Sequence, residues 1–185
     1  MKNDYCIKGD VVEVYFRYKG EKKIFTISIS KLDKMRNHEG SWFGGLDRNS
    51  GKIYIYSKLK RENGKQKSIL LHRFLTDCPK GLVVDHINGN TLNNTDENIR
   101  VCTVGQNNQN LTKLRKDNKA GFRGVSWNSR HGKWYSSIKL NGKTKHLGSF
   151  DNKDDAIKVR VEAEKKYFTH SQIATKLAHA NKKIG

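Results

Sequence analysis

The chain has 185 residues, and its 37 Lys and Arg residues outnumber its 18 Asp and Glu residues, which gives a formal net charge of +19 at pH 7. No apolar run approaches the roughly 18 residues that a membrane-spanning helix needs, and the first ten residues lack the apolar core of a signal peptide. We therefore expect a cytoplasmic protein without a membrane partner. Its expected partner is nucleic acid, because Lys and Arg that neutralise phosphates release condensed counterions.

The first 66 residues are predicted to form a β-rich module. Apolar and polar residues alternate over 12–16, 24–29 and 53–56, as is typical of half-buried strands. A scaffold and an accessory DNA contact are equally compatible with these residues. The three cysteines lie far apart and form no C-x-x-C pair that could hold zinc, as is typical of a protein kept in a reducing compartment.

Residues 82–107 carry the most specific local pattern. A buried strand is predicted over 82–84, and it delivers Asp85 and His86 to an Asn-Gly turn. Adjacent residues of a strand point to opposite faces. Asp85 and His86 are therefore expected to lie on different sides of this strand.

A second strand and a helix are predicted directly afterwards. Residues 99–102 form the returning strand, and Thr103 and Gln106 have the spacing of a capping box that opens a helix. Asn107 then lies in the first helical turn. The predicted order is strand, strand and helix.

Four residues of this segment suit the hydrolysis of a phosphodiester with one metal ion. Asp85 and Asn107 offer the oxygen ligands that a hard divalent cation prefers. His86 is free to take a proton from the attacking water, because it points away from that ion. Asn98 is expected to brace the loop between the strands through hydrogen bonds to the backbone.

Residues from about 71 to 110 resemble the HNH endonuclease motif, in the form found in phage and intron-associated homing endonucleases. The matching text is His72-Arg73, VVDHINGN, Asn98-Ile99-Arg100 and Asn107. The resemblance implies that Asp85 binds the metal, that His86 is the general base and that Asn98 fixes the loop. A structural role is expected for His72.

The sequence departs from many family members at the last position of the motif, where Asn107 replaces a His. An amide oxygen is a harder ligand than imidazole, so one Mg²⁺ or Mn²⁺ ion per active site is expected rather than Zn²⁺. Taken singly, an Asp-His pair is most often a solvated turn and an Asn-rich stretch is most often a loop. Four such positions in one frame favour the nuclease interpretation.

The C-terminal part of the chain carries more positive charge per residue than the rest. Its net charge is +12 over 112–185 (18 basic, 6 acidic), compared with +7 over 1–111 (19 basic, 12 acidic). Strands are predicted over 123–128, 133–140 and 143–148, followed by a helix over 151–168. Alternation places Val125, Trp127, Trp134, Ile138, Leu140 and Leu147 on one face, toward the helix. Both tryptophans are thus predicted to belong to the core.

The opposite face of this sheet is predicted to enter a DNA groove, because its side chains are hydrogen-bonding or cationic. The predicted DNA-binding residues are Arg123, Ser126, Asn128, Arg130, Tyr135, Ser137, Lys139, Thr144 and His146.

The same region resembles the APETALA/ethylene-response-factor DNA-binding domain of plants and its phage homing-endonuclease relatives. The matching marks are Arg123-Gly124-Val125, Gly132-Lys133-Trp134 and Leu147-Gly148-Ser149-Phe150. Ser126, Ser137 and His146 stand where several plant domains carry Arg, Glu or Trp. The DNA sequence preference of the plant domains therefore does not transfer.

These patterns together predict an α+β protein. The expected parts are a β-rich N-terminal module (1–66), a ββα-metal HNH core (67–116), a three-stranded antiparallel sheet packed on one helix (117–170) and a basic tail or short helix (171–185).

The predicted function is that of a site-specific HNH homing endonuclease that cleaves double-stranded DNA to 5′-phosphate and 3′-hydroxyl ends. It would act as a monomer or weak dimer on DNA, without an obligate protein partner, in a bacterial or phage-infected cell. Nicking is the simpler expectation for one active site per chain. The alternatives are a DNA-binding regulator with a decayed nuclease motif and a structural nucleoid or RNA-binding protein.

Overall fold

The structure is a computed structural model that describes residues 1–61, 63–111, 114 and 118–171. The chain divides into two compact units, Met1–Thr103 and Val104–Gly185. Several sheets and a few helices build it, as expected for an α+β fold. Among the described residues, no helix has the length and hydrophobicity of a membrane span.

The polar run 112–119, which suits a linker, and the predicted tail over 171–185 fall largely outside the described residues. Only Ser171 of the tail is described. The four domain ranges given above, 1–66, 67–116, 117–170 and 171–185, stay predictions.

The first unit opens with a four-stranded sheet in the order β1-β2-β3-β8. Its strands are β1 (Tyr5–Lys8), β2 (Val11–Tyr18), β3 (Glu21–Ser28) and β8 (Asn93–Asn94). The first three are antiparallel, whereas β8 runs parallel to β3. Val12, Val14 and Phe16 alternate along β2 and are buried, as the sequence pattern predicts. A short 3-10 helix (Ile29–Lys31) and α1 (Leu32–Arg36) follow β3.

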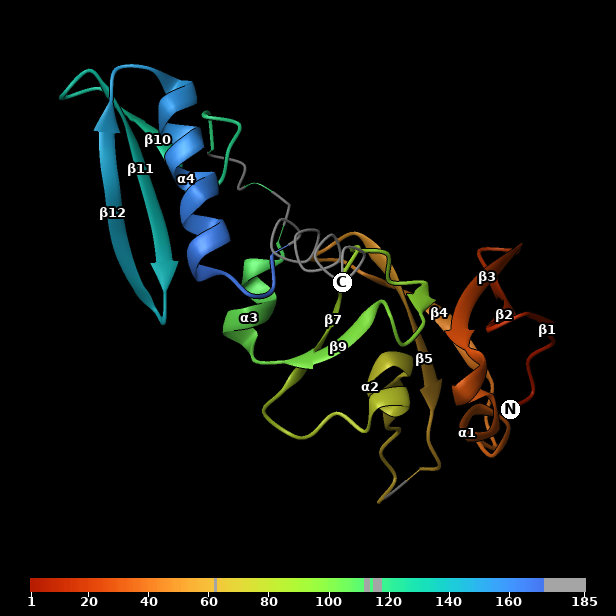
Figure 1. The fold of residues 1–185 in the computed structure, drawn as a ribbon. Coiled ribbons are helices and arrows are strands. Elements are labelled where there is room, and N and C mark those ends of the chain that lie inside the picture. The colour runs from red at the N-terminus through yellow and green to blue at the C-terminus, as the bar shows by residue number, and fades with distance from the viewer. Residues whose placement is uncertain (62, 112–113, 115–117, 172–185) are drawn as a thin grey trace. The chain divides into compact units, whose positions relative to one another are not determined.

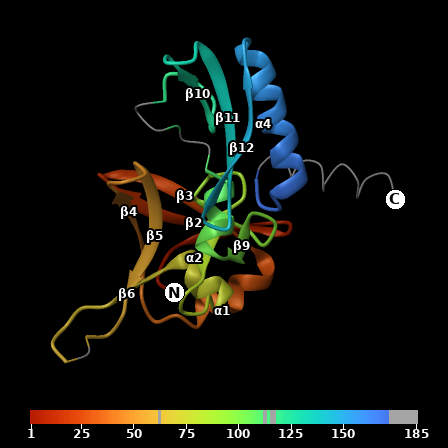
Figure 2. The same cartoon turned by 90° about the vertical axis from the view of Figure 1, so that its left-hand side faces the viewer.

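The second sheet contains β4 (Trp42–Asp47), β5 (Lys52–Lys58) and β6 (Ser68–Leu70), all antiparallel. β4 packs against β2, and Gly44 makes this close approach possible. A Cβ atom at Gly44 would lie 2.4 Å from Cε2 of Phe16, which is too close for any larger residue without movement of the ring. A long loop joins β5 to β6 (Figure 2).

The predicted nuclease segment completes the first unit. After α2 (Leu71–Thr76), strands β7 (Val83–His86) and β9 (Ile99–Cys102) pair antiparallel. The hydrophobic core of the unit draws on both sheets and on this segment. Its buried members are Val12, Val14, Phe16, Phe25, Ile27, Leu32, Met35, Trp42, Ile55, Leu71, Leu75 and Ile99. The β-rich module and the nuclease segment therefore share one core.

The second unit contains a short helix and a sheet covered by a long helix (Figure 1). Its elements are α3 (Val104–Gln109), β10 (Val125–Asn128), β11 (Lys133–Leu140), β12 (Lys143–Phe150) and α4 (Lys153–Tyr167). The sheet is antiparallel in the order β10-β11-β12, as predicted. Asn141 and Gly142 have φ values of 47° and 82°, which suit the tight turn predicted for this dipeptide.

One core prediction for this sheet is wrong, because Trp127 is 51% exposed. Trp127 lies on the edge strand β10, while α4 packs mainly on β11 and β12. The Trp127 ring contacts only the outer side of the core through Trp134, at a centroid distance of 5.2 Å. Trp134 itself packs with Ala120, Val125 and Ala156, as predicted.

Candidate active site

The candidate site lies at the end of β7, where the β7–β9 pair brings its polar residues into register. Asp85 pairs with Arg100 and His86 pairs with Ile99. The Ile87 amide donates to the Asn98 carbonyl oxygen at 2.8 Å, which continues the pairing one residue into the loop. Because successive strand residues alternate, Asp85 and His86 project from opposite faces of the hairpin.

Asp85 is buried, with 5% of its surface exposed, and it is held by a cation. Arg100 Nε and Nη2 donate to Asp85 Oδ2 at 3.0 and 2.7 Å. The two residues face each other across the strands, so the register itself creates the pair. The Asp85 carboxylate is thus held in a fixed position by charge-assisted hydrogen bonds.

His86 is also buried, and a hydrogen bond orients its ring. Its Nε2 lies 3.1 Å from Oδ1 of Asn94, whose Nδ2 donates to the Thr91 carbonyl oxygen at 3.3 Å. This orientation of Asn94 makes the amide oxygen the acceptor, so Nε2 of His86 carries the proton and the basic lone pair is on Nδ1. Burial lowers the pKa of His86, which keeps the ring neutral at physiological pH.

Two aromatic rings enclose the His86 ring. The ring centroids of His72 and Tyr54 lie 5.2 and 6.1 Å from that of His86, both edge to face. His72 is buried on α2, and desolvation lowers its pKa to about 3. His72 therefore serves as a neutral packing residue, in agreement with the structural role expected for it.

Acidification is expected to destabilise the protein through His72. Its pKa is about 3 in the folded state and about 6.5 in the unfolded chain, so only the unfolded chain takes up the proton between these values. The contribution of neutral His72 to the stability of the fold is complete above the pKa of the unfolded chain, and it is lost as the pH falls toward 3. The free energy of unfolding should fall by about 1.4 kcal/mol per pH unit in this window through this group. Denaturant unfolding of His72→Phe at several pH values should give a flatter dependence, and an unchanged slope would contradict the assignment.

Asn98 lies in the loop before β9 and ties that loop together. Its Oδ1 accepts from the Asn88 amide at 3.0 Å, and its Nδ2 donates to the carbonyl oxygens of Asn93 at 2.7 Å and Asn90 at 3.4 Å. The Asn98 side chain is buried, and its hydrogen bonds are partly buried. Such backbone hydrogen bonds are those expected of a loop brace, while a part for Asn98 in catalysis stays a prediction.

Replacing Asn98 by Ala is expected to destabilise the protein by about 1–3 kcal/mol, because partly buried backbone groups lose their partners. The exposed Asn90 provides the control, since its side chain accepts from the Leu92 amide within the same turn. Asn90→Ala should change the unfolding free energy much less. Equal losses in denaturant unfolding would show that Asn98 does not hold the loop.

Asn107 lies in α3, in the second unit, directly after the predicted helix start. Its half-buried side chain offers an amide oxygen, and Asp85 offers a carboxylate. Amide and carboxylate oxygens are each hard donors of the kind that Mg²⁺ and Mn²⁺ bind rather than Zn²⁺. Among the described residues, no group of three or more His, Cys, Asp or Glu side chains gathers for a metal. Metal binding by Asp85 and Asn107 stays a prediction.

Three further residues at the site were missed by sequence reasoning. Lys52 Nζ, from β5, donates to the Gly89 carbonyl oxygen at 2.8 Å, and its positive charge contributes to the lowered pKa of His86. Arg100 and Asn94 hold Asp85 and His86. The hairpin register would have revealed Arg100 as the partner of Asp85, but nothing local in the sequence distinguishes Asn94 from its neighbours or links Lys52 to this loop.

The predicted DNA-binding residues of the C-terminal sheet lie mostly on one face. The register pairs Ser126 with Tyr135, Ser137 with His146 and Lys139 with Thr144. Tyr135 is central to this face, because its ring contacts those of His131 and His146. The face opposite α4 is therefore polar, as expected from strand alternation.

Arg123 and Asn128 of the predicted DNA-binding set hydrogen-bond to the backbone of their own unit. Arg123 Nη1 donates to the carbonyl oxygens of Asn108 at 2.6 Å and Leu111 at 3.2 Å, so it anchors the end of α3. Asn128 Oδ1 accepts from the amides of Arg130 and His131 and shapes the turn after β10. Neither side chain reaches out from the centre of the sheet face.

Comparisons with known proteins find relatives of the β7–β9 segment and of the chain as a whole. A family model described as HNH endonuclease matches residues 72–109. Protein 3.8 of Escherichia phage T7 is 36% identical over 73 residues, which are 40% of this chain and 60% of that protein. An uncharacterized HNH endonuclease of Acanthamoeba polyphaga mimivirus is 34% identical over 163 residues, which are 85% of this chain and 77% of that protein. No solved structure matches the chain significantly.

Proposed function

Because the chain belongs to the HNH endonuclease family, we propose that it is a site-specific DNA endonuclease of the homing type. It hydrolyses a phosphodiester bond of double-stranded DNA with one Mg²⁺ or Mn²⁺ ion and leaves 5′-phosphate and 3′-hydroxyl ends. The observation that carries this proposal is the pair at the end of β7, a buried carboxylate next to a buried neutral imidazole. These are the two groups that such a reaction needs.

In the proposed mechanism His86 accepts the proton of the attacking water at Nδ1. Asn94 fixes the tautomer through Nε2, so the base is already neutral and oriented before DNA binds. Asp85 and Asn107 would hold the divalent ion, which when bound supplies stabilisation of negative charge on the phosphate and the leaving 3′ oxygen. Asn98 keeps the connecting loop in place for both groups.

Cationic side chains would assist at the same place. Lys52 lies over the loop after β7, and its ammonium group is suited to a DNA phosphate near the scissile bond. Arg100 balances the Asp85 charge in the absence of a divalent ion.

The C-terminal sheet is proposed to position the duplex, as its resemblance to the APETALA/ethylene-response-factor domain implies. The polar face of β10, β11 and β12 would enter the major groove. Its DNA contacts would come from Ser126, Arg130, Tyr135, Ser137, Lys139, Thr144 and His146, whereas Arg123 and Asn128 would act mainly within the fold. The protein would work in the cytoplasm of a bacterial or phage-infected cell, as a monomer or weak dimer on DNA.

A plasmid assay tests the proposed function. Supercoiled plasmid carrying candidate sites is incubated with the protein and Mg²⁺, and in parallel with EDTA. Nicked or linear product that forms only with Mg²⁺ supports the endonuclease. Binding without cutting supports a regulator whose nuclease motif has lost activity, and the absence of both contradicts the proposal.

The sheet is tested by Lys139→Ala. Lys139 is exposed on β11 opposite Thr144, so its loss should weaken duplex binding without a change in the cleavage rate at saturating DNA. If it meets a phosphate, the slope of log affinity against log salt should fall by about 1. Lys165, exposed near the end of α4, is the matched control, and equal effects of Lys139→Ala and Lys165→Ala would contradict the assigned face.

A further inference from the structure

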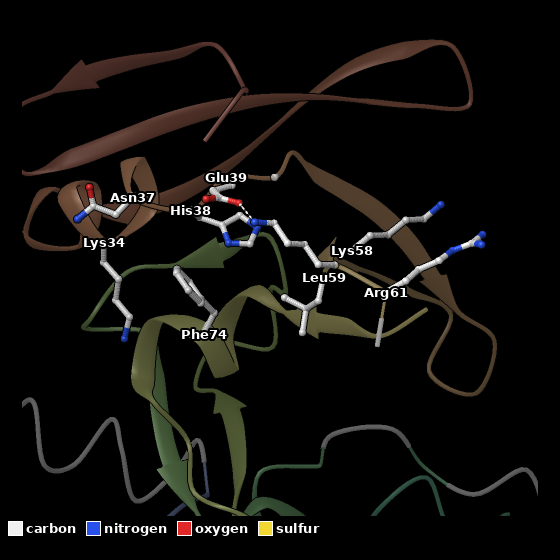
Figure 3. A pocket seen from close by; sticks show the side chains of 10 residues that line it. Lys34, Asn37, His38, Glu39, Lys58, Leu59, Arg61 and Phe74 are labelled. Atoms are coloured by element: carbon white, nitrogen blue, oxygen red, sulfur yellow. Dashed lines mark ion pairs between the residues drawn. The ribbon is translucent and has the colours of Figure 1, made fainter. Parts of the chain in front are cut away.

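The first unit contains an open groove of about 980 Å³ that none of the proposed catalytic residues lines. It lies between the end of α1 and the start of the β5–β6 loop, and α2 contributes to its wall (Figure 3). The lining residues are Lys34, Asn37, His38, Glu39, Gly40, Lys58, Leu59, Lys60, Arg61 and Phe74.

The rim of the groove is strongly cationic. Four lining residues are Lys or Arg, and Glu39 is the only acidic lining residue. Lys34 is already paired with Asp77 at 2.5 Å. Lys58 and Arg61 have no acidic partner among the described residues. Figure 3 shows that their side chains extend from the end of β5 and the start of the β5–β6 loop, away from His38 and Phe74. Lys60 pairs with Glu39 at 2.8 Å, but both side chains are more than three-quarters exposed, so this pair is easily exchanged for another anion.

The floor of the groove is aromatic and fixed. His38 Nε2 lies 2.7 Å from the Ser57 hydroxyl, and the His38 ring packs on Phe74 and Trp42 at centroid distances of 5.3 and 4.7 Å. Burial lowers the pKa of His38, so the floor carries no charge of its own. The attraction for an anion therefore comes from the rim.

The groove faces away from the candidate active site. Phe74 lines the groove and His72 contacts the His86 ring, and both residues belong to α2. Two residues apart on a helix correspond to about 200° of rotation, so the two side chains leave α2 on opposite sides. A ligand in the groove would not touch the reacting groups.

We propose that this groove, through Lys58, Lys60 and Arg61, binds the phosphate backbone of the DNA substrate outside the cleavage site. The proposal rests on the proposed endonuclease function and gives the N-terminal module a part in it. An open rim of long flexible cations around an uncharged floor suits a continuous polyanion. A free nucleotide would instead need an enclosed pocket with several fixed donors and acceptors for its base.

The groove is tested by the double variant Lys58→Ala/Arg61→Ala. Both residues are exposed, so the fold should be kept, which thermal unfolding checks. Affinity is measured in EDTA over a range of salt concentrations with a random-sequence duplex several helical turns long, because phosphate contacts do not depend on sequence. Loss of two phosphate contacts should reduce the slope of log affinity against log salt by about 1.8. Cleavage of bound target DNA in Mg²⁺ should keep its rate.

A control variant separates the groove from net charge. Lys2→Ala/Lys80→Ala removes two exposed cations of the same unit that do not line the groove. It should leave the salt slope close to that of the unmodified protein, whereas Lys58→Glu/Arg61→Glu should weaken binding beyond the Ala double variant.

The outcomes separate the groove from the proposed function. If the unmodified protein binds and cuts DNA but the groove and control variants have equal salt slopes, the proposed role of the groove is wrong. The same holds if the groove variants bind DNA as tightly as the unmodified protein. Binding of an acidic peptide or a mononucleotide that is lost in the groove variants while duplex affinity is unchanged would assign the groove to that ligand instead. Absence of both binding and cutting by the unmodified protein would remove the proposed function and the groove together.

Discussion

His86→Ala is expected to lower the single-turnover rate of DNA cleavage by about 10²–10⁴-fold, while the Kd for target DNA stays nearly unchanged. The variant removes the group that takes the proton from water. It leaves Asp85, Arg100 and the C-terminal sheet in place. Cleavage of labelled duplex at saturating protein and binding in EDTA measure the two effects separately.

Loss of the buried ring also leaves a space against His72 and Tyr54, so the fold must be checked by unfolding. His86→Gln keeps most of the side-chain volume and a polar group that can bond to Asn94, and it should be equally inactive. His131→Ala is the matched control, because His131 is exposed in the second unit. Cleavage at the normal rate by folded His86→Ala or His86→Gln would show that the general base lies elsewhere.

Asp85→Asn is expected to abolish cleavage at Mg²⁺ concentrations that saturate the unmodified protein, because a neutral amide attracts a divalent cation far less than a carboxylate does. Binding of Mn²⁺ by calorimetry should weaken in parallel. The substitution keeps the shape of the side chain, but it removes the negative charge with which Arg100 pairs at 2.7 Å. A lower unfolding free energy is therefore expected as well.

Asp96→Asn is the control for Asp85→Asn. Asp96 follows β8, accepts a hydrogen bond from Ser30 at 2.7 Å and lies 3.3 Å from Lys31 Nζ, with its side chain partly exposed. The Asp96→Asn variant should cleave DNA at the rate of the unmodified protein. If Asp85→Asn cut DNA at the same rate and with the same Mg²⁺ dependence as Asp96→Asn, Asp85 would not be a metal ligand.

The strands and the short helix after β9 could be predicted because their signals are local. Alternation along β2, the Asn141-Gly142 turn and the position of Asp85 at a strand end all follow from neighbouring residues. The surroundings of His86 could not be predicted, because Tyr54 lies on β5 and His72 lies on α2. Contacts between such distant segments depend on packing that no local pattern specifies.

The error at Trp127 has the same origin. Alternation assigns Trp127 to the helix-facing side, but it does not say how far α4 extends over the edge strand. Likewise, no local pattern reveals that the Arg123 guanidinium bonds to the carbonyl oxygens at the end of α3, and the DNA contact of Arg123 stays a prediction. Exposure and hydrogen bonding are properties of the assembled unit rather than of the strand.

The shared core gives the N-terminal module a direct bearing on the site. β5 supplies both Tyr54, which contacts the His86 ring, and Lys52, which binds the loop after β7. The nuclease segment also buries Leu71 and Ile99 in the core of the module. Of the two roles left open by the sequence, the module therefore has at least that of a scaffold, since it helps to orient the proposed base.

Anomalous diffraction from a crystal of the protein with duplex DNA and Mn²⁺ tests most directly whether Asp85 and Asn107 bind the metal ion. The expected result is one manganese peak at about 2.2 Å from an oxygen of Asp85 and from Oδ1 of Asn107, next to a DNA phosphate, with His86 on the far side of that phosphate. A complex in which DNA is bound but manganese lies away from Asp85 and Asn107 would contradict the proposed site.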